Sequence, residues 1–194
     1  MQKTVLTFGL IAGGILSAMM LLTLPFHEAI GFDRGEIIGY ATMVGAFLLI
    51  YFGVRSYRDS VAGGVVSFGR AFKVGALIAL VASSCYVATW EGFYYTVGDS
   101  FAAKYQAHIL ERERAKGATS AELEKRRSDM ERFAALYRNP AINVAITFLE
   151  PLPIGLLFAL VSAALLRRKR GGARAGGAQD AGNAQPHFSS AVGP

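Results

Sequence analysis

The sequence contains few of the residues that form disulfides, metal sites or nucleophilic active sites. A single cysteine, Cys85, excludes an internal disulfide and any site built from several cysteines. The three histidines are scattered, and no H-E-x-x-H, G-x-S-x-G or His–Cys pairing accompanies them. We therefore predict no catalytic residue, no metal site and no cofactor, and we expect that the protein is not an enzyme.

Charge is also scarce, and its absence is concentrated in four long stretches. Charged residues make up 18% of the 194 residues, fewer than a soluble domain usually carries, and none occurs between Lys3 and His27. The predicted spans cover about residues 4–26, 37–57, 72–97 and 141–166. At about 1.5 Å per residue, each can cross a hydrocarbon core of about 30 Å. Backbone polar groups in lipid must be bonded within their own segment, so we expect four helices.

Pairs of small residues four positions apart recur in three of these stretches. They are Gly9 and Gly13 in the first, Gly75 and Ala79 in the third, and Gly155 and Ala159 in the fourth. This spacing places both members of a pair on one helix face and lets helix backbones approach closely. The alternative is that small residues are simply frequent in membrane helices. We predict that these pairs pack helices into a compact bundle, which by itself implies no activity.

Basic residues border the predicted spans on one side of an up-and-down arrangement. They are Lys3, Arg55, Arg58, Arg70, Lys73 and the run 167–170. Positive residues favour the cytoplasm, so we expect both termini there and the protein in the bacterial inner membrane. The connection at 99–138 is also basic, but acidic residues balance it and most of its charges lie away from the span borders. Clustering at borders does not make the basic face of a nucleic-acid-binding protein, and no such partner is expected.

The connection at 99–138 is predicted to be a helical hairpin outside the membrane. Gly117 is expected to end its first helix, Thr119 and Glu122 to form a capping box that opens the second, and Pro140 to follow its end. Each helix has one narrow apolar face. This hairpin is the candidate surface for a protein partner, and packing of its two helices against each other is the plainer alternative.

Residues 1–170 are therefore predicted to form one four-helix transmembrane domain, followed by a tail at 171–194. The tail is rich in glycine and alanine and has few large apolar residues. It cannot offset the entropy of ordering by burying apolar surface, so we expect it to be disordered.

Three glutamates, Glu36, Glu91 and Glu150, are expected at similar depth near the outer boundary of the hydrocarbon. Each lies roughly 26 to 29 Å along its helix from the basic residue at the other end. Local roles would account for them: Glu36 lies in a first helical turn, Glu91 in an aromatic belt and Glu150 before two prolines. Alternatively, Glu91 and Glu150 face the bundle interior and share a proton or hold a cation, together with Glu36, His27 or Arg34. We favour the local roles, although Glu150 is the strongest candidate for a function.

Several motifs are similar to those of one family. They are KTVLTFGLIAGGI, GEIIGYATMV, YFGVRSYRD, SFGRAFKVG, YVATWEGFYY and the segment 139–169, which starts with NPAINVAITFLEPLPIG and ends in RRK. Over about residues 2–169 the chain resembles the uncharacterised bacterial membrane-protein family known as domain of unknown function 4199. The resemblance implies a four-helix inner-membrane protein without an assigned activity, and no functional residue can be carried over from it.

The residues and the resemblance together predict an all-α membrane protein with four transmembrane helices and an extramembrane helical hairpin between helices 3 and 4. We expect first a non-enzymatic scaffold or accessory subunit that acts in the lipid bilayer through helix packing and the hairpin. The alternative is a small transporter, or a proton- or cation-coupling component, that uses the boundary glutamates. Four spans are few for a monomeric carrier, so this alternative requires a homo-oligomer.

Overall fold

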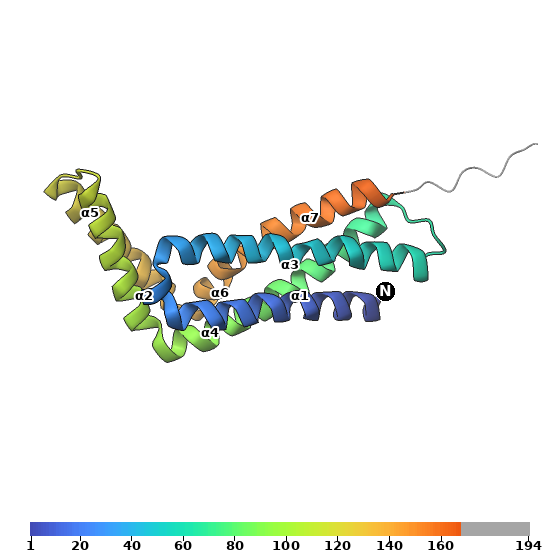
Figure 1. Ribbon diagram of the computed structural model, residues 1–194, viewed down its shortest axis with the longest axis horizontal. Helices are drawn as coiled ribbons and strands as arrows, with labels where there is room; N and C mark the ends of the chain where they lie inside the picture. Colours follow the sequence, from blue (N-terminus) through green and yellow to red (C-terminus); the bar gives the residue numbers. More distant parts are fainter. Residues whose placement is uncertain (168–194) are drawn as a thin grey trace, which may run out of the picture.

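The computed structural model describes residues 1–167, and all regular secondary structure in this part of the chain is helical (Figure 1). The elements are α1 (Gln2–Thr23), η1 (Leu24–Phe26), α2 (His27–Ile30), α3 (Phe32–Ser60), α4 (Phe68–Ala115), α5 (Ser120–Tyr137), α6 (Pro140–Phe148) and α7 (Pro151–Leu166). The tail at 171–194, for which disorder is predicted, lies outside the described residues.

Four helical segments are long and apolar enough to cross a membrane. They are Gln2–Phe26, Phe32–Ser60, Phe68–Thr96 and Pro140–Leu166. Large apolar side chains stay exposed on them, among them Leu22, Leu157 and Leu165 with relative exposures of 62%, 60% and 68%. Such a surface is unfavourable in water and suits lipid. The predicted fold class, an all-α membrane protein with four spans and a helical hairpin, is confirmed.

Helix α4 is longer than expected. We predicted that the third span ends near residue 97 and that a separate helix begins the hairpin, but α4 continues through both for 48 residues. Measured along its axis, a helix of that length is about 72 Å long, more than twice the hydrocarbon thickness of about 30 Å. Figure 1 shows α4 changing direction at the end of the bundle, after which its second part runs alongside α5. The hairpin is therefore a direct extension of the third span.

A tight turn connects α4 to α5 in the hairpin. Gly117 has a φ of +90°, a left-handed conformation that glycine adopts readily and that ends α4. Thr119 Oγ1 accepts a hydrogen bond from the Glu122 amide at 3.3 Å, and Glu122 Oε2 accepts one from the Thr119 amide at 2.8 Å. These bonds confirm the predicted capping box. The Thr119 amide and hydroxyl both donate to Glu122 Oε2, and these two bonds hold the pKa of the Glu122 carboxyl below its ordinary value because they stabilise the ionised form.

The fourth span consists of two helices with a break between them. Helix α6 ends at Phe148, and α7 begins at Pro151, which has no N–H to continue the hydrogen-bond ladder. Leu149 and Glu150 connect the two helices. Glu150 therefore lies at a junction and not along a continuous helix.

Helix α4 packs against α1 through small residues. A Cβ added to Gly9 would lie 2.7 Å from Val81 Cβ, and one added to Gly13 would lie 2.6 Å from Cys85 Cβ. Atoms this close would have to move apart, so the glycines allow the two helices their present separation.

Helix α4 also packs against α7, again through small residues. A Cβ added to Gly75 would lie 2.8 Å from Ala159 Cβ, and one added to Gly155 would lie 2.7 Å from Ala79 Cβ. Ala79 and Ala159 are fully buried at this contact. With α3 packed against α1, α4 and α7, these contacts form one bundle around α4.

Candidate functional site

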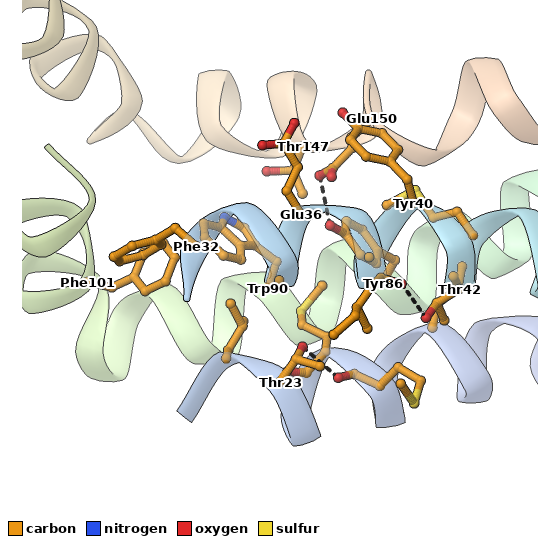
Figure 2. A pocket seen from close by; sticks show the side chains of 18 of the residues that line it. Thr23, Phe32, Glu36, Tyr40, Thr42, Tyr86, Trp90, Phe101, Thr147 and Glu150 are labelled. Carbon is orange, nitrogen blue, oxygen red and sulfur yellow. Dashed lines mark hydrogen bonds between the residues drawn. The ribbon is translucent and has the colours of Figure 1, made fainter. Parts of the chain in front are cut away.

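A cavity of about 470 Å³ opens between the helices at the hairpin end of the bundle (Figure 2). Its walls come from the second half of α1, the first half of α3, both halves of α4, the last residue of α5 and the junction of α6 with α7. The lining therefore combines residues of all four spans with residues of the hairpin.

Two carboxylates line this cavity. Glu36 comes from the second turn of α3, and Glu150 comes from the break between α6 and α7. No Lys, Arg or His occurs among the lining residues that the structure describes. When both carboxylates are ionised, the wall carries net negative charge and the two groups repel each other. A bound proton or cation would relieve that repulsion.

Tyr86 fixes the position of Glu150. Its hydroxyl donates a hydrogen bond to Glu150 Oε2 at 2.7 Å, from α4 across to the break in the fourth span (Figure 2). A hydrogen bond to an ionised carboxylate is stronger than one between neutral groups. The pair joins positions far apart in the sequence, so no local motif could have indicated it.

A chain of side-chain hydrogen bonds beside the cavity links α4, α5 and α6. Tyr137 Oη and Thr147 Oγ1 are 2.9 Å apart, and Thr147 Oγ1 donates to Asn143 Oδ1 at 3.1 Å. Trp90 Nε1 donates to the same Asn143 oxygen at 3.2 Å. Asn143 is fully buried, and its amide nitrogen has no partner within residues 1–167. The sequence does carry a signal for this hydrogen-bonded chain, because Asn143 is a lone amide in an apolar stretch.

The structure groups the glutamates differently from the pairing considered in the sequence. Glu36 and Glu150 line one cavity, whereas neither Glu91 nor Arg34 is among its described lining residues. One carboxylate oxygen of Glu91, Oε1, is buried and has no hydrogen-bond partner in the described part of the chain. The side chain of His27 lies outside the described part of the structure.

A charged and aromatic cluster attaches the start of α3 to the hairpin half of α4. Asp33 Oδ1 lies 3.0 Å from Arg112 Nη1 and 3.4 Å from His108 Nε2. Beside it, the Phe32 ring packs against Phe101 with centroids 5.8 Å apart. Phe32 and Phe101 both line the cavity, so the cluster holds the hairpin at the cavity edge.

These features define a multi-pass α-helical membrane protein with a cavity between its spans that two carboxylates line. Residues 7–168 match the family described as Protein of unknown function (DUF4199), and the chain belongs to that family. The match reaches into all four spans and includes the hairpin, which confirms the resemblance noted in the motifs. No curated protein and no solved structure matches the chain. The family description carries no activity, so a function has to come from the cavity and its residues.

Proposed function

We propose that the protein is a non-enzymatic, proton- or cation-coupling component of a membrane, with Glu36 and Glu150 as its ion-binding groups. The observation that carries this proposal is that both carboxylates line one cavity, without a basic side chain among its described lining residues. A carboxylate within a span is costly unless it is paired or protonated. A proton or cation shared by the two groups removes that cost, while Tyr86 keeps Glu150 in place.

The proposal includes a location and an assembly. Basic residues at the opposite end of the bundle favour cytoplasmic termini in a bacterial inner membrane, with the cavity near the outer face. A cavity at one end of a bundle does not form a path across the membrane. Ion movement would therefore require a homo-oligomer of this chain.

Ion flux into liposomes that contain the full chain tests this proposal. Glu36→Gln and Glu150→Gln remove one negative charge each and are expected to lower proton or alkali-cation flux about tenfold or more, the effect of about 1.4 kcal/mol. Glu91→Gln is the matched control, because Glu91 is not among the described lining residues and should leave flux unchanged. Equal flux for wild type and both cavity variants would contradict the proposal, and so would absence of any flux from the wild type.

A second candidate is the accessory role expected from the sequence, and the surface of α5 favours it. Helix α5 has no buried residue, and Phe133 and Leu136 keep 51% and 58% of their surface exposed. Exposed apolar side chains outside the spans are typical of interaction surfaces. The small-residue pairs are already used in contacts within the chain. Under this interpretation the hairpin is the surface that binds a protein partner.

A further inference from the structure

We infer that the cavity binds an organic ammonium group, with Glu36 and Glu150 as counter-ions and the surrounding aromatic rings as a cage. The inference rests on the proposed function in one respect, namely that these two carboxylates are the cation-binding groups. It goes further by naming the chemical class of the ligand.

Aromatic rings form much of the cavity wall. Tyr40, Tyr86, Trp90, Phe101 and Tyr105 all line it. The face of an aromatic ring attracts cations, most strongly in tryptophan, and quaternary ammonium groups are recognised in cages of such rings. A proton bound to a carboxylate is not stabilised by the surrounding ring faces, and a small inorganic cation prefers oxygen ligands. The wall therefore matches a cation that carries carbon substituents.

Three of these rings, Trp90, Phe101 and Tyr105, are held in place by contacts between rings. The centroids of Trp90 and Phe101 lie 6.1 Å apart with the rings edge to face, and Phe101 stacks on Tyr105 at 6.4 Å. Across the cavity edge, Phe32 packs on Tyr105 at 5.5 Å. A wall that is already ordered loses little entropy when a ligand binds, which favours affinity.

The acidic groups of the cavity do not match a calcium or zinc site. Its described lining contains two carboxylates, and residues 1–167 contain no group of three or more His, Cys, Asp or Glu side chains that could hold a metal. Protein sites for calcium usually supply more oxygen ligands, and zinc sites usually supply at least three side chains.

The remaining wall suits an alkyl group. Leu16, Met19, Met20 and Met43 line it, and methionine adapts its shape to irregular apolar ligands. The cavity volume of about 470 Å³ lies within the range of about 300 to 1,000 Å³ for small-molecule sites. The ligand chemistry is thus an ammonium head with a small apolar body. Two sources supply it: a free amine, and the ethanolamine headgroup of a phospholipid.

Trp90 provides a direct readout, since it is the single tryptophan of the chain and lines the cavity. The full chain is placed in nanodiscs of phosphatidylglycerol, which carries no amine, and choline is titrated at constant ionic strength. The uncharged analogue 3,3-dimethyl-1-butanol and sodium chloride are titrated in parallel. We expect a saturable change in Trp90 emission with choline and none with the other two.

A second set of nanodiscs, which also contain phosphatidylethanolamine, distinguishes the two sources. If the lipid headgroup occupies the cavity, Trp90 emission is shifted before any choline is added and the apparent affinity for choline falls. If the ligand is a free amine, the choline titration is the same in both lipids. Either result supports an ammonium site.

Variants connect the signal to the cavity. Glu36→Gln and Glu150→Gln should each weaken choline binding about tenfold or more, which is about 1.4 kcal/mol. Phe101→Leu should weaken it too, because it removes part of the cage, whereas Glu91→Gln should not. Each variant is first compared with wild type by size-exclusion chromatography. If one glutamate variant fails to fold, the other glutamate variant and Phe101→Leu show whether choline binds in the cavity.

Three results would overturn the inference: no saturable response to choline, an equal response to the uncharged analogue, or equal affinity in wild type and both glutamate variants. The flux experiment tests the proposed function independently of the ammonium site. Flux that depends on Glu36 and Glu150, without choline binding, would keep the coupling function and reject this ligand. Choline binding that depends on them, without any flux, would keep the ammonium site and reject coupling.

Discussion

At the scale of single residues, the closest helix contacts depend on glycines, which have no Cβ atom. A Cβ at Gly155 would lie 2.7 Å from Ala79 Cβ and 3.2 Å from Phe47 Cζ. Lipid gives helices no hydrophobic drive to associate, so van der Waals contact at such positions contributes much of the attraction between α4 and α7. The same contact limits how α7 can rotate about its axis. It therefore also bears on where Glu150, at the start of α7, can lie.

Gly155→Ala should destabilise the bundle by about 1 to 3 kcal/mol, because the added methyl group would collide with Ala79 Cβ. That atom is bonded directly to the backbone of α4, so it cannot move away unless the helix moves. Unfolding by sodium dodecyl sulfate in mixed micelles measures the change. Adding Ala79→Gly should restore much of the loss, since it removes the atom in the way. Gly14→Ala is the control, because a Cβ there meets nothing within 4 Å. Stability equal to wild type in Gly155→Ala would contradict this account.

The individual site residues could be predicted only in part. Glu36 and Glu150 stand out in the sequence as acidic residues beside or within apolar stretches. Their meeting in one cavity depends on the rotations of α3 and α7, which contacts such as Gly155 on Ala79 restrict and which hydropathy does not encode. Tyr86 could not be singled out either, because tyrosine is common near membrane interfaces.

At the scale of elements, the spans and the hairpin turn follow from local chemistry, whereas the continuity of α4 does not. Charge-free length indicates the spans, and the spacing of Thr119 and Glu122 indicates the start of α5. Between the third span and the hairpin, Gly98 and Asp99 are weak helix formers. Each costs about 1 kcal/mol or less relative to alanine, which continued backbone hydrogen bonding can offset. Propensity alone therefore could not decide whether α4 breaks there.

The exposed face of α5 leads to a prediction for the second candidate function. With p-benzoylphenylalanine in place of Phe133, irradiation of native membranes should give one discrete adduct with a protein partner, because Phe133 is 51% exposed. Glu124 is the control position, since at about 100° per residue it lies on nearly the opposite face of the helix. Electrophoresis followed by mass spectrometry identifies the adduct. No adduct from position 133, or equal adducts from both positions, would count against a partner surface.

At the scale of the whole molecule, the distribution of basic residues predicts how the bundle lies in the membrane. In a Cys85→Ser background, Ala118→Cys on the hairpin should react with a membrane-impermeant maleimide added to intact cells. Val61→Cys, in the connection between α3 and α4, should react only after the cells are opened. Both positions lie outside the candidate spans, so their reaction with the reagent reports on which side of the membrane each one lies. Reaction at position 61 and protection at 118 would invert the orientation.

The unbroken course of α4 has a mechanical consequence. Tyr86 and Trp90, which line the cavity, and Arg112, which holds Asp33 at the hairpin, belong to the same continuous helix, which bends between them (Figure 1). No loop lies between them to absorb movement. A force on the protruding end would thus reach the aromatic wall through backbone hydrogen bonds of one helix. A protein bound outside and a small molecule bound inside would each change the strain that the other experiences.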